Sequence, residues 1–433
     1  MPLTLWRDIS PIPQPLREPS NRSPHILVVG GGVTGLVSAW VLLDRGYRVT
    51  VLSSAWVSDD HRLTSQIAGA LWEFPPAVCG QHTDKISLEN SKRWCMTAYH
   101  IWDGIASIPA LSQASGVRMM PSDFFFPENI ENDHAQLSKM KEIMASGVRG
   151  FYRGSDIIDD RGVDHSYGAI DAYELMAPII DTDQAMHWLT TLVEGKGAQF
   201  VTETIQKDLV DVEDSLRERF AADLIINCTG LQGNVLAGDE SVYPIRGGLI
   251  RVINDGTDFP KVDAALTITA DAAHSSNEIV FLVPRNDNIL LIGGIAEPNE
   301  WDLDLTLDSP IIRRMRERCE MFLPCLKDAK LDPEYPLAQG LRPFRGTNVR
   351  VERELRRTGS RVIHSYGHGG AGWSLSFGCA QDIAMLVEEA LAGIPARPMK
   401  EMTKEGRSTA KNGNAVRFGR AQATFSVLDS GLL

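Results

Sequence analysis

The segment 25–53 constrains the fold most, because it has the pattern of a strand, a glycine turn, a helix and a second strand. His25–Val29 is a short apolar run, and Gly30–Gly35 with the sequence GGGVTG follows at once. Leu36–Asp44 has helical apolar spacing, Gly46 ends that helix, and Arg48–Ser53 forms the next strand. A unit of about 30 residues with this order is the context that a dinucleotide fingerprint requires. The sequence therefore predicts a Rossmann-like domain.

The three spaced glycines of this turn have distinct physical roles. Gly30 permits the tight turn, Gly32 lets the backbone approach a pyrophosphate, and Gly35 allows close packing of the helix. In the nicotinamide version of the unit, an acidic residue ends the second strand and holds a ribose. Ser53 or Ser54 occupies that place here, which disfavours a nicotinamide-dependent dehydrogenase but leaves it open.

A second glycine-rich run, Tyr366–Ser374 with the sequence YGHGGAGWS, opens directly into a helical pattern of apolar residues. It places bare backbone N–H groups and a positive helix end against an electron-rich ligand, which favours a flavin ring. Arg342, within Gly340–Pro343, is the type of residue that clamps a carboxylate with two hydrogen bonds. A flavin beside a carboxylate clamp indicates an amino-acid oxidase.

Simpler interpretations of these residues stay open at this point. His368 fits a general base, but a histidine inside a glycine-rich turn more often braces the loop by hydrogen bonds. Arg342 could instead be structural and paired with Glu352 or Glu354. The tract Gly372–Ser376 lacks the second glycine of a nucleophile elbow, so a serine hydrolase has little support.

Composition excludes several classes of function. The 433 residues carry a formal net charge of −13, which disfavours nucleic acid as a partner because most of the surface would repel phosphates. An anionic substrate must therefore meet a local cationic site. The six cysteines show neither a Cys-x-x-Cys pair nor a cluster with histidine, so we expect no metal site and no disulfide framework.

Localisation signals are absent from the printed sequence. No stretch approaches 18 uninterrupted apolar residues, and the first 24 residues lack the apolar core of a secretion signal. The final Gly431–Leu433 is not a peroxisomal tripeptide. We therefore expect a cytoplasmic protein with no membrane association.

The chain is long enough for two domains, and its patterns divide it into discontinuous parts. Residues 1–24 form an N-terminal extension, and residues 25–70, 171–245 and 340–395 are assigned to the nucleotide domain. Residues 71–170, which we expect to be irregular with short helices, and residues 246–339, which carry alternating β-branched runs, form a substrate domain. Residues 396–433 are expected to be a loosely docked tail. The fold class is thus mixed α/β, with an antiparallel or mixed sheet beside the Rossmann-like domain.

Seven ordered motifs in residues 25–395 resemble the D-amino-acid oxidase family. They are Gly30–Gly35, Ala68–Trp72, Ile226–Gly230, Arg246-Gly247, Gly340–Pro343, Arg350–Glu354 and Tyr366–Gly370. The resemblance implies non-covalent FAD and oxidation of a D-amino acid to an imine, with hydride transfer to flavin N5. The imine hydrolyses to a 2-oxo acid and ammonia, and O2 is reduced to H2O2.

The same resemblance assigns residues one by one. In it, Arg342 binds the substrate carboxylate and Gly370 accepts the substrate amine through its carbonyl group. The residues that it assigns to FAD are Gly30, Gly32, Val33, Thr34, Gly35, Ser53, Ser54, Thr64, Ser65, Gly69, Ala70, Leu71, Ile205, Cys228, Thr229, Gly230, Arg342, His368, Gly369, Gly370, Gly372, Trp373 and Ser374.

Three positions bear on the substrate. Phe281 stands where the family commonly has a tyrosine whose hydroxyl contacts the carboxylate, and the loss of that bond costs about 1 kcal/mol. Asn277 stands where some members have another tyrosine. Glu73 lies close to where the resemblance places the substrate side chain, and there it favours cationic or polar side chains unless it is a surface or structurally paired residue.

Other functions remain open alternatives to a D-amino-acid oxidase. The same fold and chemistry serve oxidases of N-substituted or secondary amino acids, and an oxidase of an unusual amino acid in a biosynthetic pathway would suit the change at Phe281. A flavin-binding protein without oxidase turnover belongs to another class. The expected partners are an amino acid and O2, and assembly as a homodimer stays open.

Overall fold

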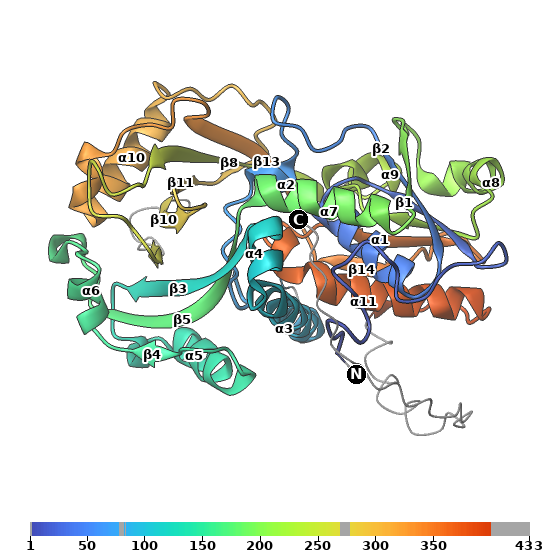
Figure 1. Cartoon of the computed structure of the whole chain (residues 1–433), viewed down its shortest axis with the longest axis horizontal. Helices are drawn as coiled ribbons and strands as arrows, with labels where there is room; N and C mark the ends of the chain where they lie inside the picture. Colours follow the sequence, from blue (N-terminus) through green and yellow to red (C-terminus); the bar gives the residue numbers. More distant parts are fainter. Residues whose placement is uncertain (1, 78–81, 83, 269–277, 400–433) are drawn as a thin grey trace, which may run out of the picture.

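The computed structural model describes residues 2–77, 82, 84–268 and 278–399. Their strands form two sheets that lie side by side (Figure 1). The six-stranded sheet has the order β14 (Arg350–Arg353), β15 (Val362–Tyr366), β7 (Leu224–Asn227), β1 (His25–Val29), β2 (Arg48–Ser53) and β6 (Gln199–Thr202). All of its pairings are parallel except that of β14 with β15. This confirms the predicted α/β fold class and the strand–turn–helix–strand unit.

Helices cover both faces of the six-stranded sheet. On one face, α1 (Val33–Asp44) packs against α11 (Gly372–Leu391) and α7 (Thr182–Gly195), while α8 (Leu209–Phe220) covers the other face. The strand β1 alternates accordingly, because Ile26 and Val28 enter the core with α1, and Leu27 enters the core with α8. Two further short helices are α2 (Thr64–Ile67) and α9 (Gly233–Leu236).

The second sheet is mixed, as predicted. Its order is β12 (Glu297–Pro298), β8 (Val242–Ile253), β11 (Ile289–Ile295), β10 (Glu278–Pro284), β9 (Ala265–Ile268), β3 (Val117–Phe126), β5 (Asp171–Ile180) and β4 (Tyr152–Arg153), with β13 (Leu337–Arg345) also paired to β8. Its neighbouring helices are α4 (Pro109–Ser115), α5 (His134–Ser146), α6 (Asp156–Asp160) and α10 (Pro310–Phe322). In Figure 1 this sheet occupies the left half of the molecule.

Two segments lie elsewhere than the sequence analysis placed them. Residues 171–180 form β5, which pairs along its full length with β3, so they belong to the nine-stranded sheet. Residues 340–345 belong to β13, which pairs with β8 in that same sheet before the chain crosses to β14. Both segments were assigned to the nucleotide domain because strand patterns do not show which partner a strand will choose.

The stretch after residue 71 is more regular than expected. It contains α3 (Lys85–Ala106), a helix of 22 residues that packs against α11 of the nucleotide domain. Trp102 anchors the contact, because its Nε1 donates to the carbonyl oxygen of Trp373 at 3.3 Å and its ring packs edge-on against Phe377. The expected short helices are present as α4 and α6, but the sequence analysis missed α3, whose buried face includes the aromatic residues Trp94, Tyr99 and Trp102.

The N-terminal extension is docked on the nucleotide domain through the buried Asp44. Its carboxylate accepts hydrogen bonds from the backbone N–H groups of Ser10 (2.7 Å) and Leu16 (2.9 Å) and from Trp40 Nε1 (2.8 Å). Lys196 Nζ lies 2.7 Å from Asp44 Oδ1, and neither side chain has any exposed surface. One carboxylate therefore joins the extension to the ends of α1 and α7. The expected tail lies largely beyond residue 399, outside the described residues.

We predict that Asp44→Ala lowers the free energy of unfolding by about 3–5 kcal/mol, because it leaves the Lys196 ammonium buried without a counter-charge. Urea unfolding of the FAD-saturated protein measures the change. Asp308→Ala removes an ion pair with Arg313 whose aspartate side chain is 90% exposed, and this control should change stability by less than about 1 kcal/mol. Equal effects of the two substitutions would contradict the role of Asp44.

Candidate active site

A cavity of about 680 Å³ opens at the carboxyl ends of β1, β2 and β7. This is the edge at which doubly wound sheets bind nucleotides. Of the residues predicted to hold the cofactor, those that line it are Gly30, Gly32, Val33, Thr34, Ser53, Ser54, Thr64, Ser65, Gly69, Ile205, Cys228, Thr229, Gly230, Arg342, His368, Gly369, Gly370, Gly372 and Trp373. Ala70, Leu71 and Ser374 line a second cavity, and Gly35 lines neither.

The first glycine turn is packed too tightly for any side chain. A Cβ atom on Gly30, whose φ is +121°, would lie 2.4 Å from the carbonyl oxygen of Cys228. A Cβ atom on Gly35 would lie 1.9 Å from the carbonyl oxygen of Gly30. Bare backbone at both places lets β1, β7 and the start of α1 meet, and this explains why Gly35 supports the cavity without lining it.

Two helix ends with no side-chain cap face the cavity. The N-cap of α1 is Gly32 and the N-cap of α11 is Ala371, and neither cap makes a side-chain hydrogen bond. Gly372 and Trp373, in the first turn of α11, line the cavity. The Val33 N–H, first in α1, donates to Ser65 Oγ at 3.1 Å. The other N–H groups of the two first turns and the positive ends of both helix dipoles point toward one space, which suits a ligand with a pyrophosphate and an electron-rich ring.

The end of β15 and the glycine run that follows it add two buried polar atoms that have no partner among the described residues. They are Ser365 Oγ and His368 Nε2, and both residues line the cavity. The His368 ring makes no hydrogen bond to the described part of the chain, so it does not brace the loop in that way. Burial lowers the pKa of His368 to about 4, which keeps the ring neutral near pH 7. Unsatisfied buried groups of this kind fit a polar ligand.

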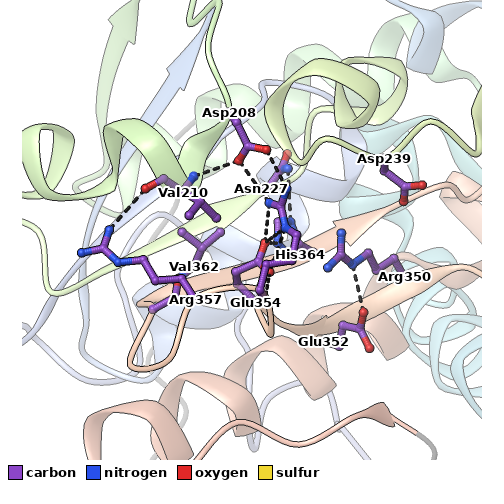
Figure 2. Close-up of polar contacts among 12 residues, drawn as sticks. Asp208, Val210, Asn227, Asp239, Arg350, Glu352, Glu354, Arg357, Val362 and His364 are labelled. Carbon is purple, nitrogen blue, oxygen red and sulfur yellow. Dashed lines mark hydrogen bonds and ion pairs between the residues drawn. The ribbon is translucent and has the colours of Figure 1, made fainter.

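Asn227, His364 and Glu354 form a chain of buried polar side chains, which Figure 2 shows, behind the cavity-lining Thr229. Thr229 donates to Asn227 Oδ1 from its backbone N–H (3.2 Å) and from its hydroxyl group (2.7 Å). The Asn227 amide must therefore turn Nδ2 toward His364 Nδ1, 3.3 Å away, which leaves His364 Nε2 to donate to Glu354 Oε2 at 3.0 Å. Burial lowers the pKa of His364, so the neutral ring holds Thr229 in place at the cavity wall.

A second cavity of about 280 Å³ adjoins the first, and the two share Gly69, Leu249, Arg342 and Gly370. Phe281 and Ala371 also line it. The ring of Phe281 packs against bare backbone, because a Cβ atom on Gly69 would lie 2.4 Å from Phe281 Cε1. Asn277 lies outside the described residues.

Arg342 lies at the junction of the two cavities without an acidic partner among the described residues. Its Nη1 donates to the carbonyl oxygen of Ile295 at 3.0 Å, and its guanidinium lies flat over Gly247, where a Cβ atom would come within 2.4 Å of Cζ. The structural alternative for Arg342 was wrong, because Glu352 pairs with Arg350 and Glu354 pairs with Arg356 and His364. Burial lowers the pKa of Arg342 to about 10, so it stays charged near pH 7.

The far part of the second cavity was not predicted beyond Glu73. It is lined by Phe124–Phe126 of β3, Gln136 and Lys139 of α5, and Tyr173 of β5. Glu73 is not a lone charge, because Lys139 Nζ lies 2.9 Å from its Oε1. No motif marks these residues, since three separate elements bring them together. Gly247, which lies beside Arg342, was likewise not predicted as a site residue, although the sequence analysis named it in the Arg246-Gly247 motif.

A family model described as FAD dependent oxidoreductase matches residues 25–386. The chain belongs to the FAD dependent oxidoreductase family. The D-amino-acid oxidase of Streptomyces coelicolor is 29% identical over 369 residues, which cover 84% of this chain and 97% of that protein. The D-amino-acid oxidase of Rubrobacter xylanophilus is 28% identical over 372 residues, which cover 84% of this chain and 96% of that protein. The glycine oxidase of Geobacillus kaustophilus has the same fold, with a TM-score of 0.65 and 16% identity. The match covers 85% of this chain and 95% of that protein.

Membership of this family makes the chain an FAD-dependent oxidoreductase, and the first cavity fits that cofactor. Its glycine turns, its two uncapped helix ends and the unpartnered atoms of Ser365 and His368 suit the pyrophosphate and the flavin ring. Over the described residues, no helix combines the length and apolar character needed to cross a membrane, and no group of His, Cys, Asp or Glu side chains suits a metal ion.

We predict that His368 makes stability depend on pH between about 4 and 6.5. The pKa of His368 is 6.5 in the unfolded chain and about 4 in the folded chain. Between these values the unfolded chain binds a proton that the folded chain does not, so the free energy of unfolding falls as the pH falls through this window. The slope from this residue reaches about 1.4 kcal/mol per pH unit.

Urea unfolding of the FAD-saturated protein between pH 7.5 and 5 tests this prediction. The His368→Gln variant should lose that part of the slope. His165 is an exposed residue whose side chain is 68% accessible, so His165→Gln serves as the control and should keep the slope of the original protein. A His368→Gln slope equal to that of the control would show that the prediction is wrong.

Proposed function

We propose that this chain is an amino-acid oxidase that acts on a D-amino acid. The observation that carries the proposal is Arg342, a desolvated guanidinium without an acidic partner in the described residues, at the junction of the two cavities. A cation in that state is stabilised by a bound anion, and a planar carboxylate matches its two-pronged donor geometry. The two D-amino-acid oxidases that match most of the chain support the choice of enantiomer.

The cavities define how an amino acid would lie. With its carboxylate on Arg342, the substrate extends its side chain into the second cavity, lined by Phe281 and the aromatic residues beyond. Gly370 lines both cavities, so its carbonyl group is our candidate acceptor for the substrate amine. This pose leaves the α-carbon facing the first cavity, and the catalysis rests largely on orientation.

FAD would be held without a covalent bond, by backbone groups of the two glycine turns and the ends of α1 and α11. The chemistry that bound FAD supplies is acceptance of the α-hydrogen as a hydride at N5 and return of two electrons to O2, which yields an imine and H2O2. The chain contributes position and electrostatics. The positive end of α11, near Trp373 and Ser374, stabilises negative charge on a ring bound beside it.

The size of the second cavity supports this function over the oxidation of glycine or small N-methyl amino acids. An oxidase of glycine or small N-methyl amino acids needs little space for a side chain. About 280 Å³ holds many water molecules, since one occupies roughly 10–15 Å³ of such a volume. The cavity therefore favours a substrate with a large side chain.

We predict that D-amino acids with large side chains bleach the visible flavin band of the purified protein under anaerobic conditions. Air should restore the band with release of H2O2. L-isomers and N-methyl amino acids form the comparison panel in the same stopped-flow experiment. A flavin that stays oxidised with every compound would leave a flavin-binding protein without oxidase turnover as the better description.

We predict that Arg342→Ala raises the KM for the best substrate about 30-fold or more while FAD stays bound. Loss of one partner of a desolvated charge pair costs about 2–5 kcal/mol of binding free energy. A tenfold loss of affinity corresponds to about 1.4 kcal/mol, so the lower end of this range is about 30-fold. Gly247→Ala should also raise KM, by about tenfold, because its methyl group displaces the guanidinium of Arg342.

Gly346→Ala is the matched control for Gly247→Ala. A Cβ atom on Gly346, just after β13, makes only an ordinary contact of 3.5 Å with the Ser241 carbonyl oxygen. Its kinetics should equal those of the original protein. Unchanged KM in both Arg342→Ala and Gly247→Ala would remove the carboxylate role from Arg342.

A further inference from the structure

We propose that Glu73, Lys139 and Tyr173 form a recognition site for the end of the substrate side chain, and that it selects an aromatic group carrying a neutral hydrogen-bond donor. A phenol or an indole N–H has this chemistry. The inference rests on the proposed function for the placing of the carboxylate on Arg342. It adds the class of side chain that the second cavity takes.

The wall of the cavity is aromatic. Tyr173 of β5 lies beside Phe124 and Phe126 of β3, with ring centroids 5.1 and 5.4 Å apart and the rings tilted by 31° and 38°. All three residues are buried and line the cavity, and Phe281 lines it as well. Rings placed in this way make favourable contacts with a flat aromatic guest rather than with a polar chain.

Two of the polar groups that line this cavity, the Glu73 carboxylate and the Tyr173 hydroxyl group, have hydrogen-bonding capacity left over among the described residues. Lys139 Nζ is 2.9 Å from Glu73 Oε1 and donates to the carbonyl oxygen of Pro76 at 2.9 Å. Glu73 Oε2 and the Tyr173 hydroxyl group make no hydrogen bond to another described residue. Tyr173 is only 2% exposed, so its hydroxyl group has little access to bulk water and suits a ligand in the cavity.

The ion pair determines which end group fits. Because Lys139 compensates Glu73, the pair exerts no net charge, and the preference for cations expected from Glu73 alone does not follow. An anionic end group would compete for Lys139 and leave Glu73 without its counter-ion, which costs free energy at a partly buried site. A neutral O–H or N–H group donates to the open Glu73 oxygen and leaves the pair intact.

The size of the cavity agrees with this choice. A methyl side chain would leave most of the roughly 280 Å³ to water, whereas a ring would fill the space between Arg342 and the ion pair. The Tyr173 hydroxyl group remains protonated at neutral pH, because burial raises its pKa to about 12. It can therefore act as donor or acceptor toward the same end group.

The test compares two unreactive carboxylates, 3-(4-hydroxyphenyl)propanoate and 3-phenylpropanoate, which differ only in the phenolic hydroxyl group. Each is titrated into the FAD-loaded protein, and the flavin spectrum reports binding. We expect the hydroxylated ligand to bind about tenfold more tightly. A ratio near one, or failure of both ligands to bind, overturns the proposal.

Two variants assign the selectivity to these residues. Glu73→Met/Lys139→Met removes both charges together and should bring the ratio near one, and Tyr173→Phe, which removes a single hydroxyl group, should lower it. The control is Lys92→Met/Glu142→Met, which removes an ion pair of 2.5 Å between α3 and α5 that does not line the cavity. It should keep the tenfold ratio. A ratio preserved in both test variants overturns the assignment.

This titration separates the inference from the proposed function. Binding and its selectivity are read without turnover, so a protein that bleaches with no D-amino acid but distinguishes the two ligands would retain the recognition site and lose the oxidase. A protein that oxidises D-amino acids but binds the two ligands equally would retain the oxidase and lose the recognition site. For an active enzyme, kcat/KM for D-tyrosine against D-phenylalanine should follow the ligand ratio.

Discussion

A desolvated cation, Arg342, with no acidic partner among the described residues is the constraint around which the site is arranged. Taking a guanidinium out of water costs several kcal/mol unless an anion compensates it. Arg246 and Arg345, on the same pair of strands as Arg342, each have acidic partners, whereas Arg342 has a single carbonyl oxygen among the described residues. Gly247 leaves the space in which that guanidinium lies. Within the described part of the chain this charge is therefore uncompensated, and it lies where both cavities meet, so a bound anion would stabilise it.

The position of that charge follows from how the chain crosses between its two sheets. Arg342 lies in β13, in register with Ile245 of β8, so the nine-stranded sheet fixes its backbone. The next residue, Pro343, accepts a hydrogen bond at its carbonyl oxygen from the Gly369 N–H at 2.9 Å. That bond joins β13 to the glycine run that leads into α11. The cation and the run that faces the cofactor cavity are thus held in fixed relation by one strand and one loop.

Local patterns predicted the parts of this arrangement that local physics determines. The strand–turn–helix–strand unit and the helix after the second glycine run depend on neighbours a few residues away, so the sequence shows them. The choice of partner by β5, the single long helix α3 and the docking of the N-terminal extension on Asp44 depend on residues far apart in the chain. Glu73 shows the limit most clearly, because its charge was visible in the sequence and its partner Lys139, 66 positions away, was not.

The two cavities use different kinds of chemistry, and this difference affects how freely each can change. The first cavity relies on backbone N–H groups and helix ends, and its glycines at positions 30 and 35 leave no room for a Cβ atom, so a substitution there disturbs the sheet itself. The second cavity relies on side chains from β3, β5 and α5, each of which can change without moving the glycine turns. The residues that line both cavities, Gly69, Leu249, Arg342 and Gly370, are the exceptions, and at Gly69 the ring of Phe281 lies where a side chain would be. Selection of the side chain can therefore vary independently of cofactor binding except at these shared residues. A change in the Phe281 ring, which lines only the second cavity, reaches the first cavity through Gly69, against which the ring packs.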